Sequence, residues 1–424
     1  MNKQILHIAL PSIISNITVP LLALVDTTIV GHLGSASYIA AIALGGMIFN
    51  MIYWLFNFLR MGTGGLTAQA YGANQHQATS YILLRSLTIA GGIALTLLLL
   101  QRPIFQVTFH FVTATAEVRS LASIYFNILI WGAPAMLALY SFTGWFLGMQ
   151  NARIPMCIAI TQNVVNIAVS TFLVFGCHLK IEGVALGTLI SQYTALLLAV
   201  IFCLTKFDVK QHFELKAILD INTLKRFFQI NRDIFLRTLC LIAVTTYFTS
   251  AGSTQGELTL AANTLLMQFF IIFSYFMDGF AYAGEALGGR YFGAHDRLNF
   301  QRVTRCLFAW GGALSVLFFF IYFLSGTSLL HLLTDDSQVI NRAQQYLPII
   351  YFIPLISFAA FLFDGLYIGT TATRYMLISM FCASAAFFVL INVCTLSNTL
   401  LWLAFLVYLG GRGLMQAFLF KKAV

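Results

Sequence analysis

Charge is scarce in this sequence of 424 residues. Asp, Glu, Lys and Arg make up 9% of the chain and hydrophobic residues 59%, whereas soluble domains carry about 25% charged residues. The chain therefore lacks the polar shell that a water-soluble core of this size requires. This composition excludes a soluble enzyme, a disordered protein and a small disulfide scaffold, and it indicates a protein that is embedded in a membrane.

The motifs of catalysis and metal binding are also lacking. The seven Cys are scattered, mostly within apolar runs, and their spacing fits neither a metal site nor a disulfide framework. The sequence contains no H-E-x-x-H motif, no Walker loop and no nucleophile elbow, which are the local signatures of zinc proteases, nucleotide-driven proteins and hydrolases. We expect neither an enzyme nor an ATP-driven pump, and we expect no metal site and no organic cofactor.

Long apolar runs are what the sequence has instead. A membrane-spanning helix needs about 20 apolar residues, and spanning β-strands would be about ten residues long with strict alternation. The runs are longer than such strands and do not alternate, so the sequence predicts an all-α polytopic membrane protein. The twelve expected spans are residues 5–31, 38–71, 78–101, 121–150, 154–176, 183–205, 230–251, 257–292, 299–325, 343–371, 374–396 and 398–420.

The positions of Lys and Arg predict the orientation. With the N-terminus inside, sixteen of the 23 basic residues fall in cytoplasmic loops or in the cytoplasmic ends of spans, four in outer loops and the other three within spans. Such an excess marks the cytoplasmic side of a membrane protein. It accounts for the formal net charge of +9 without nucleic acid as a partner. We expect a multi-pass membrane protein with both termini in the cytoplasm.

The two halves of the chain have the signs of an internal repeat. A shift of 221 residues takes Tyr71-Gly72-Ala73-Asn74 onto Phe292-Gly293-Ala294-His295, and it also takes Gly144, Gly148 and Arg153 onto Gly365, Gly369 and Arg374. Six spans per copy give both copies the same orientation, as in transporters whose halves are related by a pseudo-twofold axis along the membrane normal. The expected domains are an N-lobe at 1–205, a cytoplasmic linker at 206–229 and a C-lobe at 230–424.

Asp26 is the residue on which the predicted mechanism depends. It lies late in the first span, in the outer half of the membrane, and its own lobe offers no base at that depth. Charge inside a membrane is costly and marks function, and desolvation favours the neutral acid. We therefore predict that Asp26 takes up and releases the coupling proton. The alternatives are a helix N-cap or an ordinary carboxylate in a water-filled vestibule.

The other charged residues within spans predict a second group. Asp278, Glu285 and Asp364 of the C-lobe have bases at similar depth, and the spans also hold Arg60, Arg237 and Arg412. Such acids can stay ionised as pairs. We expect a charge network in the C-lobe, and a cytoplasmic gate in which Arg60 pairs with Glu285 or Asp278. It is equally open that Arg60 bonds carbonyls within its own lobe.

Polar residues and prolines complete the candidates. Asn163 and Asn166 are three residues apart and share a helix face, so they can hydrogen-bond Asp26 or simply join helices. Pro11 and Pro20 lie in the first span, where proline frees a carbonyl and bends a helix. The segment that carries Asp26 is therefore a candidate for bending.

Several stretches of this sequence resemble the DinF-like members of the multidrug and toxic compound extrusion (MATE) family. The resemblance rests on residues 10–33, which include Val25-Asp26-Thr27, on residues 58–73, on residues 278–286 and on residues 364–369. It covers almost the whole chain.

The resemblance implies a monomeric exporter with two lobes of six spans, which expels organic and often cationic or amphipathic compounds in exchange for protons or sodium ions. It implies that Asp26 is the proton site and that Asn163, Asn166 and Thr188 surround it. Related proteins commonly carry a second acid four residues after the Asn matched by Asn166, and this chain has Ser170 there. That departure favours a single-carboxylate proton mechanism over sodium. A flippase for lipid-linked oligosaccharides, which shares the fold, is the alternative function.

Overall fold

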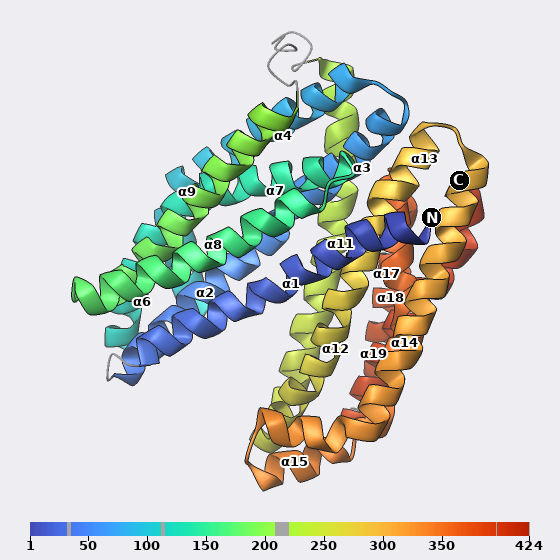
Figure 1. The fold of residues 1–424 in the computed structure, drawn as a ribbon. Helices are drawn as coiled ribbons and strands as arrows, with labels where there is room; N and C mark the ends of the chain where they lie inside the picture. Colours follow the sequence, from blue (N-terminus) through green and yellow to red (C-terminus); the bar gives the residue numbers. More distant parts are fainter. Residues whose placement is uncertain (32–34, 112–114, 208–219, 396, 424) are drawn as a thin grey trace. The chain divides into compact units, whose positions relative to one another are not determined.

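The structure is a computed structural model that describes residues 1–31, 35–111, 115–207, 220–395 and 397–423. These residues are helical without a strand (Figure 1). Within this part of the chain, twelve helical segments are long and apolar enough to cross a membrane, which confirms the predicted fold class. They are Asn2–Gly31, Ala36–Gly72, His76–Leu99, Ala116–Gly148, Arg153–Gly176, Ile181–Lys206, Ile221–Ser253, Glu257–Gly293, Arg297–Leu333, Leu347–Gly369, Thr373–Val393 and Asn398–Lys422.

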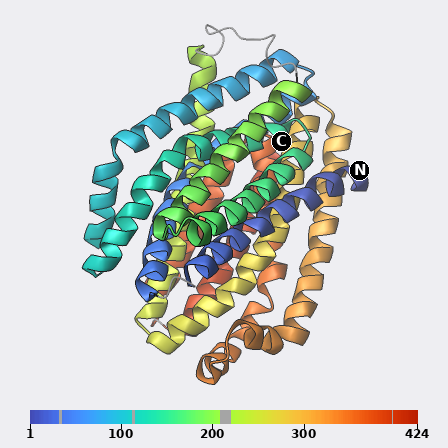
Figure 2. The same ribbon diagram turned by 60° about the vertical axis from the view of Figure 1, so that its left-hand side comes forward.

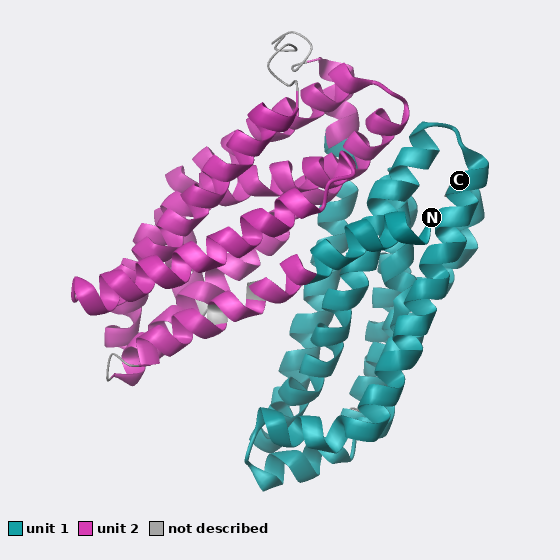
Figure 3. Cartoon of the chain, in the orientation of Figure 1, with its two compact units in different colours: residues 1–13, 228–424 teal, residues 14–227 magenta. Residues whose placement is uncertain are grey.

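The chain forms two compact units, which are coloured separately in Figure 3. Unit 2 is Ile14–Phe227, and unit 1 combines Met1–Ile13 with Phe228–Val424. The first helix, α1 (Asn2–Gly31), thus begins in unit 1 and continues in unit 2. The other helices of unit 2 are α2 (Ala36–Phe56), α3 (Phe58–Gly72), α4 (His76–Leu99), α5 (Gln101–Phe111), α6 (Ala116–Leu129), α7 (Ala133–Gly148), α8 (Arg153–Thr171) and α9 (Ile181–Lys206).

Unit 1 has the same plan of long helices joined by short turns. Its helices after the start of α1 are α11 (Ile221–Ser253), α12 (Glu257–Ala283), α13 (Gly289–Gly293), α14 (Arg297–Leu333), α15 (Ser337–Gln344), α16 (Leu347–Ile350), α17 (Ile353–Gly369), α18 (Thr373–Val393) and α19 (Asn398–Ala423). The residues of α11 up to Phe227 belong to unit 2. Aromatic rings join α12 and α14: Phe273 of α12 meets Phe318 of α14 with ring centroids 5.4 Å apart. The Tyr322 hydroxyl of α14 also donates to the Phe269 carbonyl at 2.6 Å, so the two helices are in contact at these residues. Figure 2 shows the same helices in a second view.

The division of α1 differs from the predicted boundaries at 205 and 230. Those boundaries gave all of the first helix to the N-lobe, whereas residues up to Ile13 pack in unit 1. The cause is a close approach at Gly279 of α12, where a Cβ would lie 2.4 Å from Ile13 Cγ1 and 2.9 Å from the Ala9 carbonyl oxygen. Of the predicted linker, residues 208–219 lie outside the described residues. That the two lobes move against one another remains a prediction.

The internal repeat is visible in the backbone. Asn74 and His295 are 221 positions apart, and both are in the left-handed region, with φ of 58° and 55°. Gln150 and Thr371 have the same separation and the same conformation, with φ of 64° and 54°. Few residues other than glycine adopt this conformation, so the coincidence at two separate turns confirms that the halves are copies.

Two glycines make the same interhelical contact in both copies. A Cβ on Gly144 of α7 would lie 2.1 Å from the Arg60 carbonyl oxygen, and a Cβ on Gly365 of α17 would lie 2.1 Å from the Ala281 carbonyl oxygen. Each pair again differs by 221 positions. Any side chain there would push the helices apart, which explains why both copies have glycine at the crossing.

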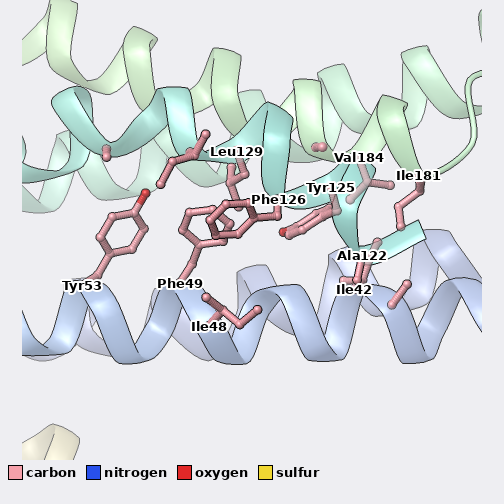
Figure 4. Close-up of a cluster of buried hydrophobic side chains, with 14 of the residues drawn as sticks. Ile42, Ile48, Phe49, Tyr53, Ala122, Tyr125, Phe126, Leu129, Ile181 and Val184 are labelled. Carbon is pink, nitrogen blue, oxygen red and sulfur yellow. The ribbon is translucent and has the colours of Figure 1, made fainter. Parts of the chain in front are cut away.

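Apolar packing in unit 2 fixes α2 and α6 beside each other (Figure 4). Phe49 of α2 and Phe126 of α6 stack with centroids 5.3 Å apart, and Phe126 is completely buried. The neighbouring Tyr125 is also buried and closes against Gly45, where a Cβ would lie 2.5 Å from its ring. This packing holds α6 in place beside α9, with Tyr125 near enough to feel the charge of Asp26 on α1.

Candidate coupling site and charge cluster

Asp26 lies inside α1, five residues before the helix ends at Gly31. Its position within a continuous helix excludes the N-cap interpretation. The residue is 7% exposed. Its Oδ2 atom is 3.5 Å from the Thr188 hydroxyl of α9, which is a long hydrogen bond, and its Oδ1 atom accepts no hydrogen bond from the described residues.

Thr188 is held by two further contacts. The Asn166 side-chain amide of α8 donates to its hydroxyl oxygen at 2.9 Å, and that oxygen lies 3.0 Å from the Val184 carbonyl. A hydroxyl group has one hydrogen to donate, so Thr188 can bond either Val184 or Asp26. The shorter distance favours Val184 in this structure.

Asp26 has no basic neighbour in the described part of the chain: no Lys, Arg or His nitrogen lies within ion-pair distance of its carboxylate. The titratable group on which the charge of Asp26 acts most clearly is the phenol of Tyr125 on α6. The Tyr125 side chain is neutral at ordinary pH. The site is therefore a buried carboxylate with a hydroxyl as its polar neighbour.

Asn163 does not join this group. Its side-chain amide donates to the Thr18 carbonyl oxygen of α1 at 2.9 Å, and the Thr18 hydroxyl donates to the Ser15 carbonyl at 2.7 Å. The four residues predicted to act together thus form two attachments of α1: Asn163 binds the backbone two residues before Pro20, and Thr188 with Asn166 meets Asp26. Neither Pro11 nor Pro20 ends α1, which is one helix throughout, and its bending stays a prediction.

The charge cluster of unit 1 is built around Asp364 on α17. Its carboxylate accepts hydrogen bonds from Arg237 of α11 and from Arg412 of α19, the latter at 2.9 Å. Gln416, one turn after Arg412, donates to the other carboxylate oxygen at 2.5 Å. The three charged side chains are at most 10% exposed. Paired and hydrogen-bonded in this way, the acid can remain ionised although it is buried.

The remaining charged candidates lie elsewhere. Glu285 is 1% exposed in the π-helical turn Gly284–Gly288, and Asp278 is half-buried on α12, where its charge acts on Arg412. Arg60 is buried on α3. An ion pair of Arg60 with Glu285 or Asp278 would join the two units, and it stays a prediction.

Comparison with known proteins gives the family. The MatE profile matches residues 11–172 and again 234–394, one match in each half. The chain belongs to the MATE family. It is 36% identical to DNA damage-inducible protein F of Escherichia coli (strain K12), over 99% of this chain and 92% of that protein. It is also 27% identical to the multidrug export protein MepA of Staphylococcus saprophyticus, over 49% of this chain and 46% of that protein.

Solved structures agree with the fold of this MATE protein. A crystal structure of MATE in the bent conformation superposes with a TM-score of 0.87 at 17% identity, and the match covers 99% of this chain and 96% of that chain. An outward-facing conformation of a multidrug resistance MATE family transporter gives 0.84 at 18% identity over 100% of this chain and 95% of that chain. Members of the family are transporters and not enzymes, as expected for this chain.

Three groups that take part in the polar sites of this MATE protein were not predicted from the sequence. Gln416 stands at i+4 from Arg412 in an apolar span, and that spacing was a usable signal because it places both side chains on one helix face. Tyr125 and the Thr18 carbonyl gave no such signal. Both act through the packing of helices that are distant in sequence.

Proposed function

We propose that this MATE protein exports organic, amphipathic or cationic compounds in exchange for protons, and that Asp26 is the coupling residue. The observation that carries the proposal is the burial of the Asp26 carboxylate with no cationic partner among the described residues. An ionised carboxylate is costly in such a place. Protonation of Asp26 therefore relieves a penalty, and that gain can be coupled to a conformational change.

The Thr188 hydroxyl gives the site two hydrogen-bonding states. When Asp26 is ionised, Thr188 donates to the carboxylate across the 3.5 Å contact. When Asp26 is protonated, Thr188 turns its hydrogen to the Val184 carbonyl, 3.0 Å away. Asn166 donates to the Thr188 oxygen in both states, so it keeps the hydroxyl in position while the hydrogen changes acceptor.

Alternating access of the two lobes converts this local change into export. The MATE structures that resemble the chain include a bent and a straight conformation, which supports a cycle with more than one shape. In our proposal α1 bends at Pro11 or Pro20, and Arg60 pairs with Glu285 or Asp278 to close the cytoplasmic side. Reversing the charges of Arg60 and its acid together should restore transport that either single change abolishes. Failure of both double variants would refute the gate.

We further propose that the protein acts as a monomer in the bacterial inner membrane, with both termini in the cytoplasm. The concentration of Lys and Arg in the segments assigned to that side supports the orientation. Cysteine labels introduced near each terminus should react from the cytoplasmic side only.

Two other functions are less well supported. A flippase for lipid-linked oligosaccharides needs free bases for a diphosphate, but the buried Arg237 and Arg412 are engaged by Asp364. A sodium site built from two acids is also less well supported, because Ser170 supplies a neutral oxygen where relatives commonly have the second acid.

The experiment that tests the function is efflux from proteoliposomes that contain the purified protein. With ethidium and tetraphenylphosphonium as probe cations, the wild type should drive efflux under an imposed pH gradient and not under a sodium gradient. Asp26→Asn should abolish the gradient-driven flux. Asp296→Asn, the same chemical change outside the spans, is the matched control and should transport normally. Normal efflux by Asp26→Asn would refute proton coupling at Asp26, and efflux driven by sodium would replace the proton with sodium.

A further inference from the structure

Three buried oxygen atoms near the coupling site have no hydrogen-bond partner among the described residues: Asp26 Oδ1, Asn166 Oδ1 and Ser170 Oγ. Asp26 is 7% exposed, and Asn166 and Ser170 are completely buried. A buried polar atom without a partner costs about 1–3 kcal/mol. Three such atoms on two adjoining helices indicate a ligand that serves them together.

The helices bring these atoms to one place. Asn166 and Ser170 are four residues apart on α8, so they lie one above the other on the same face. The Ser170 hydroxyl points at α9, where a Cβ on Gly187 would be 2.1 Å from Ser170 Oγ. Gly187 directly precedes Thr188, which contacts both Asp26 and Asn166. Ser170 therefore lies where α8 meets α9, beside the residue that contacts Asp26.

The Ser170 hydroxyl is also free to donate. Several buried serines in the helices of this protein bond the carbonyl of the preceding turn, as Ser12 does to Ile8 at 2.8 Å and Ser357 does to Ile353 at 2.7 Å. Ser170, like Ser315 and Ser384, makes no such bond. Its hydroxyl hydrogen is therefore available for another acceptor.

We propose that Ser170 is a positioning residue of the Asp26 site and holds one buried water molecule, which donates to Asp26 Oδ1 and to Asn166 Oδ1. Ser170 donates the third hydrogen bond, to the water oxygen. Three bonds to polar groups are the usual number for a buried water molecule, and this arrangement satisfies all three oxygens. The inference rests on the proposed role of Asp26.

The water molecule explains how a buried acid can release its proton. A donor aimed at Asp26 Oδ1 stabilises the ionised carboxylate, and it opposes the burial that favours the neutral acid. Relatives commonly carry a second acid at this position. In this chain Ser170 takes its place, as a neutral group that acts on Asp26 through the water molecule. The charge of Asp26 acts on the Tyr125 phenol of α6, and this phenol stays neutral across the pH range of the test.

Infrared difference spectroscopy of the purified full-length protein tests this inference. Acid-minus-alkaline spectra should contain the carbonyl band of protonated Asp26, identified by its loss in Asp26→Asn, and a water O–H band that shifts in H2(18)O. Ser170→Ala should lose the water band. It should also move the midpoint of the Asp26 band to higher pH by roughly one unit, because a hydrogen bond to an ionised group is lost.

Ser384→Ala is the matched control, because the Ser384 hydroxyl of α18 is likewise buried without a partner among the described residues but belongs to unit 1. It should leave both bands unchanged. An unchanged spectrum in Ser170→Ala would overturn the role of Ser170 while the proposed function stands. If the midpoint of the Asp26 band moved with added sodium chloride but not with choline chloride, a cation would occupy the site between these oxygens, and the proposal of a water molecule would be overturned. Absence of any Asp26 band would overturn the proposed function as well.

Discussion

Two of the buried aspartates, Asp364 and Asp26, should differ in their response to the same substitution. Asp364→Asn removes the negative charge that Arg237 and Arg412 share and leaves two guanidinium groups buried beside a neutral amide. Breaking a buried ion pair by removing one partner costs about 3–5 kcal/mol. Asp26→Asn removes a charge that has no cationic partner among the described residues, so its cost should stay below about 1 kcal/mol.

Thermal unfolding in detergent measures this difference. For units of about 200 residues, 1 kcal/mol corresponds to roughly 2–4 °C in Tm, so Asp364→Asn should lower Tm by about 10 °C. Asp26→Asn should stay within about 3 °C of the wild type. Intrinsic tryptophan fluorescence and the elution profile in size-exclusion chromatography give independent readouts. The reasoning would be refuted if both variants lost the same stability, because the environments of the two carboxylates would then be equivalent.

The other predictions concern packing and titration away from the coupling site. Gly144→Ala should destabilise the protein by about 1–3 kcal/mol, because its Cβ would lie 2.1 Å from the Arg60 carbonyl oxygen. Gly312→Ala, whose Cβ meets no described atom within 4 Å, should be neutral or stabilising. Chemical denaturation measures both, and a greater loss of stability in Gly312→Ala than in Gly144→Ala would contradict this account of the packing. Hydrogen bonds from the Asn299 backbone and side-chain amides lower the pKa of Asp296, so its stabilisation is present above its unfolded pKa of about 4 and is lost as the pH falls below that value. Asp296→Asn keeps a good helix cap and should flatten the loss of stability between pH 5 and 3; an unchanged acid limb would count against this assignment.

The spans and the repeat were predictable because each follows from a local rule. Apolar length decides which segments can cross a membrane, and all twelve predicted spans are helices of sufficient length. The repeat could be recognised in the sequence at residues 71–74 and 144–153, because turns and close helix crossings restrict the residue type. At Asn74 the restriction is a left-handed backbone with φ of 58°, and at Gly144 it is contact with a neighbouring backbone.

The geometry of the Asp26 site and of the charge cluster around Asp364 was only partly predictable. The depth of charges in the spans predicted bases near Asp364 and none near Asp26; among the described residues, Asp364 has Arg237 and Arg412 beside it, and Asp26 has no base within ion-pair distance. The sequence did not reveal that Asn163 binds the Thr18 carbonyl, because residues three apart on one face can still reach different turns of a neighbouring helix.

The division of α1 had no signal in the sequence. Its apolar run continues through residue 13 without a break, and the boundary arises from the approach of α1 to Gly279. The partner of a helix is a property of packing between distant segments, which composition and periodicity do not encode.

Proton release on substrate binding tests the central claim most directly. In weakly buffered detergent solution, a pH-sensitive dye should record protons released from the wild type when tetraphenylphosphonium binds, and calorimetry in two buffers of different ionisation enthalpy should give the same count. We predict close to one proton per bound cation at neutral pH, and none for Asp26→Asn even where it still binds the probe. Equal proton release by Asp26→Asn and the wild type would contradict the account.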